Sequence, residues 1–419
     1  MTADAPEVST PEVVEALPSL WRNRSFNLLW GSQLLSDLGT NMSSLAFPLL
    51  VLALTGKPVL AGVVGTGAAI VRLVVRLPSG VLADRIDRKH AMMASDGIRL
   101  VAFAGLGVLI LTGHAALPWI LAAALIEAFG STIFETMENA ALRNVVPIPQ
   151  VPLAVARNEA RTSAAALVGP PLGGLLFSIA RAVPFLADAL SYGCSLIGVS
   201  MIRTPMQEER TEPAGSIRAD MSEGIRFAIA NPFIRIALLL APLLNIGFNG
   251  MLFAVIIILR GHGVAPGLIG LVETIVSIGG LLGALCAGAL QKRFSLRTLV
   301  LSISWLGAVL MASASLLTGG VEVAIPIALA IFFSPACNAA MFGYIAAITP
   351  DRLQGRVMSV LFFAAMSLAS LGPLLAGALY TWLHGPGTVL VFAGCIGAAA
   401  VLVTFSAGGR NMREIPTST

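Results

Sequence analysis

The sequence predicts an all-α membrane protein, with twelve transmembrane helices in two six-helix pseudo-repeats around a central cavity. Three observations support this prediction: the composition, the number of long apolar runs, and the distribution of Lys and Arg. Of the 419 residues, 56% are hydrophobic and only 11% are charged, whereas about 25% of the residues of a soluble domain are charged. The mean hydropathy of +0.87 agrees, so the chain does not have the composition of an ordinary soluble domain.

Twelve apolar runs are long enough to cross a bilayer, which takes roughly 20 residues. We expect spans at 26–54, 58–82, 91–112, 117–140, 158–180, 183–202, 233–258, 267–290, 297–317, 321–347, 357–380 and 386–406. They divide the chain into a cytoplasmic N-terminal tail (1–25), an N-terminal six-helix bundle (26–202), a cytoplasmic linker with an interfacial helix (203–231), a C-terminal six-helix bundle (232–406) and a cytoplasmic C-terminal tail (407–419). The alternative for the linker is a simple tether.

The basic residues predict the orientation, because Lys and Arg concentrate on the cytoplasmic side of membrane proteins. With the N-terminus inside, the predicted outer loops hold only three of the 26 Lys and Arg residues, namely Lys57, Arg181 and Arg260. Arg72 and Arg76 fall inside a span, and the others are assigned to the inner side. Both termini are therefore expected in the cytoplasm.

The two halves echo one another. GPPLGGLL at 169–176 recurs as GPLLAGAL at 372–379, and GVLADR at 80–85 recurs as GALQKR at 288–293. Internal repeats of this kind are typical of transporters whose two bundles enclose a substrate site.

Polar side chains recur at helical spacing inside several spans, which predicts stripes that face water or one another. The stripes are charged in the N-terminal half and neutral in the C-terminal half, and we expect them to line the cavity. They comprise Gln33, Asp37, Asn41 and Ser44 in the first span, Arg72 and Arg76 in the second, Glu127, Ser131, Glu135 and Glu138 in the fourth, Asn245 and Asn249 in the seventh, and Ser334 and Asn338 in the tenth.

Depths estimated at ~1.5 Å per residue from the cytoplasmic ends indicate which charges meet. Asp37 and Arg72 both come out at roughly 15 Å, and Arg76 and Glu135 at roughly 9 Å. We expect these two ion pairs, with Glu127 left as an unpaired acid that carries the coupling proton. The alternative is that all five charges only neutralise one another and fix the packing of this half.

The stretch GVLADRIDRK at 80–89 places five charges directly after a long apolar run. Its basic residues hold the turn on the inner side, and Gly80 permits a close helix contact through which Asp84 meets a helix end. The stretch resembles the motif between the second and third helices of the major facilitator superfamily. Asp87 stands where most of that superfamily has Gly, a departure that resembles the drug and siderophore exporter branch, which includes macrolide-efflux and enterobactin exporters.

A second inner turn, GRV at 355–357, resembles that branch's turn before the eleventh helix. Together the two turns are expected to form a cytoplasmic gate, engaged in the outward-open state and broken to admit substrate. Its residues are Gly80, Asp84, Arg85, Arg88, Lys89 and Arg356.

Gly169, Pro170, Gly173 and Gly174 resemble the antiporter motif Gly-Pro-x-x-Gly-Gly found in exporters of the superfamily. Proline kinks a helix and glycine permits tight contact, so the motif predicts a hinge or a seal. A purely packing role is the alternative.

The resemblance implies a secondary active efflux transporter that exports an amphiphilic antibiotic or secondary metabolite in exchange for protons. It also implies a bacterial inner membrane, and we expect a monomer that needs no cofactor beyond the proton gradient. Two alternatives remain: a lysophospholipid or nutrient facilitator of the same fold, and a membrane receptor or scaffold that does not transport its ligand.

Other classes of function lack their motifs. No Gly-rich phosphate loop ending in Lys and Ser or Thr occurs, so ATP is not expected as the energy source. The cysteines and histidines are too scattered to bind a metal, and no nucleophile, base and orienting group can be assembled into an enzyme site. The basic residues form no continuous patch for nucleic acid.

Overall fold

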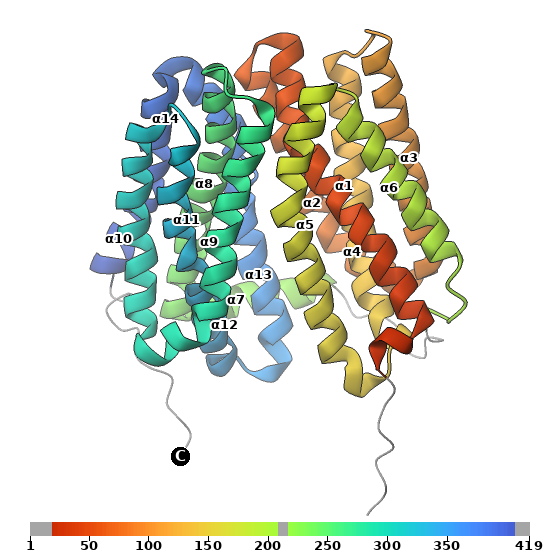
Figure 1. Cartoon of the computed structure of the whole chain (residues 1–419). Coiled ribbons are helices and arrows are strands. Elements are labelled where there is room, and N and C mark those ends of the chain that lie inside the picture. Colours follow the sequence, from red (N-terminus) through yellow and green to blue (C-terminus); the bar gives the residue numbers. More distant parts are fainter. Residues whose placement is uncertain (1–18, 208–216, 407–419) are drawn as a thin grey trace, which may run out of the picture.

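The computed structural model describes residues 19–207 and 217–406 (Figure 1). These residues are helical throughout, with no strand among them. The first half contains six long helices: α1 (Arg24–Thr55), α2 (Pro58–Arg85), α3 (Arg88–Leu111), α4 (Leu117–Val145), α5 (Val151–Ile179) and α6 (Val183–Ser200). The second half contains α8 (Pro232–Gly261), α9 (Pro266–Arg293), α10 (Leu296–Ala314), α11 (Ala324–Phe332), α12 (Ser334–Ile348), α13 (Asp351–Ala369) and α14 (Gly372–Phe405). Short 3-10 turns lie at Leu20–Arg22, Ile148–Gln150, Ser315–Leu317 and Val321–Val323.

Local sequence explains where the helices begin and end. The Asn23 side chain accepts a hydrogen bond from the amide of Phe26 and so caps α1. Gly56 ends α1 in the left-handed conformation that glycine adopts without strain. Pro58, Pro232 and Pro266 open their helices at a position where the missing N–H costs nothing.

Eleven helical segments of the described chain are long and apolar enough to cross a membrane. The last of them, Asp351–Phe405, holds two of the predicted spans. It breaks at His384, where φ is +56°. Before the break Gly377 contacts Pro58 at the start of α2, and after it Phe392 contacts Gly250 within α8. The chain therefore reverses at His384, which agrees with the twelve spans predicted from the sequence.

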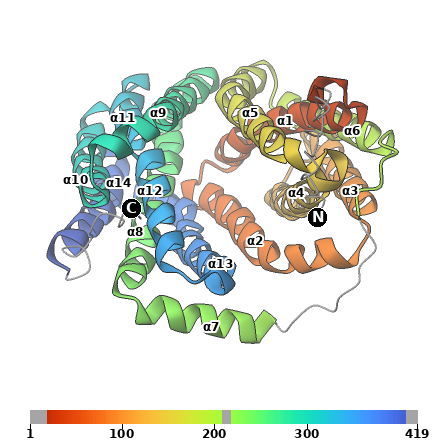
Figure 2. The ribbon, with the colours of Figure 1, turned by 90° about the horizontal axis from the view of Figure 1, so that it is seen from below.

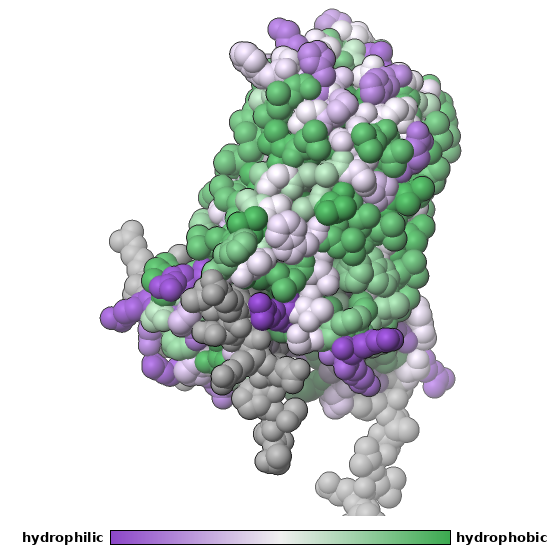
Figure 3. All heavy atoms as spheres, turned by 90° about the vertical axis from the view of Figure 1, so that its left-hand side faces the viewer, coloured by the Kyte–Doolittle hydropathy of each residue, from purple (hydrophilic) through white to green (hydrophobic). Residues whose placement is uncertain are grey.

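The tenth predicted span is interrupted in its middle. Helices α11 and α12 meet at Phe333, and Pro335 lies in the first turn of α12, where it has no N–H to continue the hydrogen bonding of α11. The space-filling view shows a green apolar belt between purple polar ends (Figure 3). That surface suits the hydrocarbon core of a bilayer, in which apolar side chains need no burial in protein.

The two halves stand side by side, with α5 beside α9 and α2 beside α14 (Figures 1 and 2). The linker contains α7 (Ile217–Ala230), which packs against α13 and lies across one end of the molecule. A helix in the linker was expected from the sequence. We call this end the inner side, following the orientation predicted from the basic residues.

Candidate functional site

Two groups of cavities among the described residues lie between the helices that carry the predicted polar stripes. The acidic pocket, about 270 Å³, lies within the first half between α1, α3, α4 and α5; its lining includes Asp37, Arg99, Glu135, Glu138, Glu159 and Arg161. The aromatic crevice consists of two adjoining spaces of about 190 and 530 Å³ between α2 and the second half. It is lined by Arg72, Arg76, Asn249, Phe342, Met358 and Phe362 among others.

One of the two predicted ion pairs is confirmed and the other is wrong. Arg76 Nη2 lies 3.1 Å from Glu135 Oε1, as expected. Arg72, however, pairs with Glu127 at 2.7 Å, so Glu127 is not the unpaired acid and Asp37 is not the partner of Arg72. The physical reason is helix packing: α2 lies against α4, whereas α1 lies mainly against α5 and α6. Depth along a helix says nothing about which neighbour its face meets.

Asp37 instead shares one arginine with a second acid. Arg161 Nε donates to Asp37 Oδ2 (2.8 Å), while its Nη1 and Nη2 donate to the two oxygens of Glu138 (2.8 and 3.2 Å). Arg161 and Glu138 are nearly buried, but the Asp37 side chain remains 25% exposed. Two carboxylates on one guanidinium leave one excess negative charge, and Asp37 is the member of the triad that water can reach.

Arg161 is the member of this triad that the sequence reasoning did not place in the charge network. Its span was expected to begin at 158, which placed Arg161 with the inner basic residues. Helix α5 begins at Val151, so Arg161 lies ten residues, roughly 15 Å, inside it. The available signal was its position eight residues before the antiporter motif on the same helix.

A second charged network is structural. Asp96 and Arg99 of α3 form a buried ion pair, and Asp96 Oδ2 accepts a hydrogen bond from Ser195 of α6, which in turn accepts from Gln33 of α1 (2.6 and 2.7 Å). The Arg99 guanidinium also lies 4.3 Å from the centroid of the Tyr192 ring. These contacts join α1, α3 and α6 in the core of the first half.

The predicted cavity-lining residues fall into two groups. Gln33 and Ser131 line the acidic pocket, and Asn249 lines the aromatic crevice. The remaining predicted residues are not among the lining of either cavity, and each has a hydrogen bond within its own helix: Asn41 to Asp37 O, Ser44 to Asn41 O, Asn245 to Ala241 O, and Asn338 to Ser334 Oγ.

The antiporter-like motif lies where the halves meet on the outer side. A Cβ at Gly169 or Gly173 would overlap α1, and a Cβ at Gly174 would overlap the carbonyl oxygen of Pro266 in α9. Gly270 of α9 similarly has no room for a Cβ, because the carbonyl of Pro170 lies against it. Helix α5 runs unbroken through the prolines. In this conformation the motif packs backbone against backbone, a contact that both the predicted seal and the packing alternative require, and we call this contact the outer seal.

The prolines create a further bond across this seal. In a regular helix the carbonyl of Leu167 would accept from the amide of residue 171, but Pro171 has no N–H. Thr274 Oγ1 of α9 donates to Leu167 O instead, at 2.9 Å. On the opposite side of the molecule, Thr66 Oγ1 of α2 accepts from the amide of Leu374 in the first turn of α14 (3.0 Å). A threonine hydroxyl in each half thus forms a hydrogen bond with a backbone group of the other half.

The predicted cytoplasmic gate is not engaged in this conformation. Gly80 has open space where a Cβ would lie, so the close helix contact expected there is absent, and Asp84 has no hydrogen-bond or ion-pair partner among the described residues. Asp84 and Arg85 are exposed. Arg356 pairs with Glu223 of α7, which also lies 2.8 Å from Arg352. The second turn therefore holds the linker helix rather than mirroring the first.

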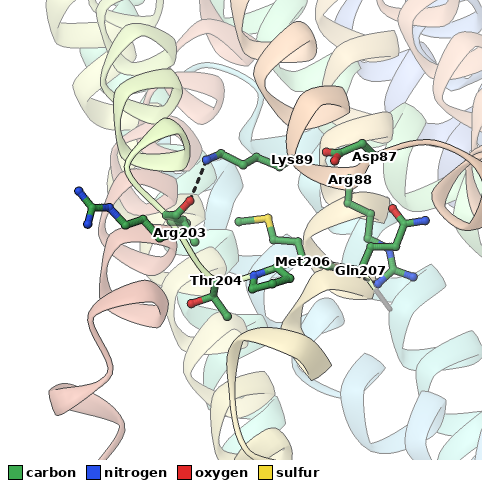
Figure 4. A pocket seen from close by; sticks show the side chains of 9 residues that line it. Asp87, Arg88, Lys89, Arg203, Thr204, Met206 and Gln207 are labelled. Atoms are coloured by element: carbon green, nitrogen blue, oxygen red, sulfur yellow. Dashed lines mark hydrogen bonds between the residues drawn. The ribbon is translucent and has the colours of Figure 1, made fainter. Parts of the chain in front are cut away.

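Arg88 and Lys89 hold the other end of the linker (Figure 4). Arg88 donates to the carbonyls of Ala83, Ala140 and Met206, and Lys89 Nζ donates to those of Ser200 and Ile202. The carbonyls of Ala83, Ser200 and Ile202 lie at or near the C-terminal ends of α2 and α6, where positive charge is favourable. A cavity of about 290 Å³ lies beside them and is also lined by Arg203, but Arg88 and Lys89 already donate hydrogen bonds to the chain.

Asp87 begins α3. Its Oδ1 accepts from the amide of His90 at 2.8 Å, an N-cap that the usual glycine could not make. This amide lowers the pKa of the Asp87 carboxyl from its ordinary value.

Comparison with known proteins identifies the family. The family of transmembrane secretion effectors, a branch of the major facilitator superfamily, matches residues 17–415. The chain belongs to this family. Its relatives include the multidrug efflux pump Tap of Mycolicibacterium fortuitum, 28% identical over 84% of this chain and 88% of Tap. The major facilitator-type transporter YkuC of Bacillus subtilis is 24% identical over 59% of each chain.

Solved structures of other transporters share the fold of this secretion effector. A bacterial homologue of the human lysosomal transporter Spinster, in an inward-facing conformation, superposes with a TM-score of 0.67 at 16% identity, over 94% of this chain and 98% of that one. The nucleoside transporter NupG gives 0.73 at 12% identity, over 92% and 100%. The family and the fold confirm a multi-pass membrane transporter rather than an enzyme.

Proposed function

We propose that the protein is an efflux pump that exports an amphiphilic small molecule in exchange for inward-moving protons. The observation that carries this proposal is the triad of Asp37, Glu138 and Arg161 beside an inner pocket. A buried site with one excess negative charge is stabilised when it takes up a single cation. A proton or a cationic substrate can supply that charge, and exclusion of one by the other is what exchange requires.

The proton would sit on Asp37. When this carboxyl is protonated, its attraction for Arg161 weakens, while Glu138 still holds the guanidinium through two bonds. Asp37 belongs to α1, and the other two members belong to α4 and α5. Protonation therefore loosens α1 from α5, one turn from the place where Gly169 packs on Asn41. In this way the charge state of the triad is coupled to the outer seal.

The likeness to exporters supports the direction of transport. Tap, whose name describes a multidrug efflux pump, covers most of this chain, and the glycine-proline motif resembles that of antiporters. The proposal includes a bacterial inner membrane, termini in the cytoplasm and a monomer that uses only the proton gradient. Rocking of the two halves would carry the substrate outward once the seal opens.

Everted membrane vesicles test the exchange directly. With the interior acidified by respiration, an added substrate should drive protons out, and a pH-sensitive dye follows the release. We expect release from the parent protein and from the control Glu322→Gln, which lies in the η4 turn, far from the cavity. Asp37→Asn should abolish it, because the amide cannot take up and release a proton in this pH range.

Two results would overturn the proposal. Substrate-driven proton release by Asp37→Asn at the parent rate would remove Asp37 from the coupling step. If the substrate only equilibrated across the vesicle membrane, at a rate that a protonophore does not change, the protein would be a facilitator instead.

A further inference from the structure

A cation already occupies the point where the two cavities meet. The Arg76 guanidinium lies between the Glu135 carboxylate, 3.1 Å from Nη2, and the ring of Phe362, whose centroid is 4.8 Å from Cζ. Glu135 belongs to the first half and Phe362 to the second. A carboxylate facing an aromatic ring is a binding site for an organic cation, because both attract positive charge. We call Glu135 and Phe362 the cation site.

Arg76 is held there weakly. About half of its side chain is exposed, as is that of Glu135, and a single ion-pair contact joins them. Pairs of this kind contribute little to stability. Arg161 provides the contrast, since it is 3% exposed and makes three charged hydrogen bonds. A ligand can therefore displace Arg76 at small cost, whereas Arg161 stays in place.

The surroundings select the same kind of ligand. Phe342, Phe363, Met358 and Met366 border the aromatic crevice around the cation site, and aromatic and thioether side chains adapt to varied apolar shapes. Acids outnumber bases in the adjoining acidic pocket by four to two, and Asp96 already neutralises Arg99. Once Arg76 swings away, the region holds a surplus of negative charge beside an apolar surface.

We propose that the substrate carries a cationic group that replaces Arg76 between Glu135 and Phe362, while its apolar body lies in the aromatic crevice. Arg76 is thus an internal stand-in that neutralises Glu135 when no substrate is bound. This inference rests on the proposed export function for its purpose, but binding alone tests it. It assigns the substrate class, amphiphilic cations, and makes Arg76 a competitor of the substrate rather than its ligand.

Two probes of the same shape and opposite charge distinguish a site for cations from a site at which Arg76 binds an anion. Tetraphenylphosphonium and tetraphenylborate are titrated onto the purified full-length protein in nanodiscs, and binding to empty nanodiscs is subtracted. We expect saturable binding of the cation only. Arg76→Ala should tighten it about three- to tenfold, because the competing guanidinium is gone; Arg76→Gln provides a second variant with the same charge removed.

Removing the cation site should have the opposite effect. Glu135→Gln should weaken cation binding about tenfold, and Phe362→Leu about threefold, whereas Phe362→Tyr, which keeps the ring, should restore it. Glu322→Gln serves as the control and should bind as the parent does. Unchanged or weaker cation binding by both Arg76 variants, unchanged binding by Glu135→Gln, or saturable tetraphenylborate binding of equal affinity would each overturn the inference. Because no proton flux is measured, failure here is separate from failure of the exchange at Asp37.

Discussion

The two halves of this transporter share a helical plan but bury different side chains. The first half buries Asp96, Arg99, Glu127, Glu138, Arg161 and Asp188. In residues 232–406 the buried polar side chains are Ser304, Ser315, Thr318, Thr349, Ser370 and Thr388, and none carries a charge. Glu273 of α9 lies within a span of the second half but is partly exposed. Charge is therefore concentrated in one body, and the other supplies an apolar and aromatic surface.

This difference indicates that the two helix bundles have different roles. Isolated charges in hydrocarbon are expensive, so a bundle that holds several must pair them, and pairing fixes its helices to one another. The second half escapes this constraint and can present flexible Met and Phe side chains to varied ligands. Under the exchange proposed above, the first half would bind the proton, and the second half would add apolar and aromatic side chains to the substrate site.

The largest difference between the two halves is expected when the arginine of the triad, Arg161, is replaced. Arg161→Met leaves Asp37 and Glu138 facing each other without a counter-charge, and an unpaired buried charge costs ~3–5 kcal/mol. We expect a large fall in thermal stability and no transport. Thr388→Val, at an equally buried site in the second half, should change stability by about 1 kcal/mol or less, because its hydroxyl bonds only its own helix.

A triple variant separates charge balance from packing. Arg161→Met combined with Asp37→Asn and Glu138→Gln leaves no unpaired charge in the triad, so this variant should recover most of the lost thermal stability. It should still fail to exchange protons for substrate. Thermal unfolding in detergent measures both effects. If the triple variant were as unstable as Arg161→Met, the triad would stabilise the fold through the shape of Arg161 and not through charge.

The next prediction concerns the seal, where the backbone of α5 in the first half contacts the backbone of α9 in the second half. Gly174→Ala forces a Cβ onto the carbonyl of Pro266, and overpacking costs about 1–3 kcal/mol. The outward-closed state should lose population by about tenfold or more. Gly267→Ala is the matched control in the same interface, because its nearest neighbour, Leu175, would lie 3.8 Å from the new Cβ.

Labelling from outside reports this change. A cysteine introduced at Leu252, on the side of α8 that faces the interior of the molecule, should react faster with a membrane-impermeant thiol reagent in Gly174→Ala than in Gly267→Ala. Equal rates in the two variants would show that the contact at Pro266 does not control access.

Much of the fold follows from the sequence, because hydropathy and basic residues report directly on the bilayer. The apolar runs gave the spans, and even the break at His384 lies in the interval left between two of them. The extents of helices were less predictable. Helix α5 continues for seven residues beyond the apolar run at its inner end, because protein contacts and water satisfy polar side chains there, and this hid Arg161.

The pairing of charges was beyond the sequence for a different reason. Spacing shows that Arg72 and Arg76 share a face of α2, but the partner depends on which helix packs on that face. In the structure α2 packs against α4, so Arg72 pairs with Glu127 of α4. Asp37 of α1 pairs instead with Arg161 of α5. Gly80 shows a similar limit: the sequence predicted a close helix contact there, but no atom of the other described helices lies within 4 Å of its Cβ position in this conformation.

The smallest effect distinguishes Thr274, which bonds across the seal, from a threonine that bonds only within its own half. Thr274→Val removes the donor to Leu167 O, a carbonyl that Pro171 leaves without a helical partner. Opening the seal already breaks this bond, so the variant should weaken only the closed state, by about 1 kcal/mol, and raise the open population about fivefold. Thr381→Val in outer α14 removes a bond to its own helix and should leave the labelling rate of the Leu252 cysteine unchanged. Equal labelling of the two variants would mean that the Leu167 carbonyl finds another donor when the seal is closed, and that glycine packing alone holds the two halves together.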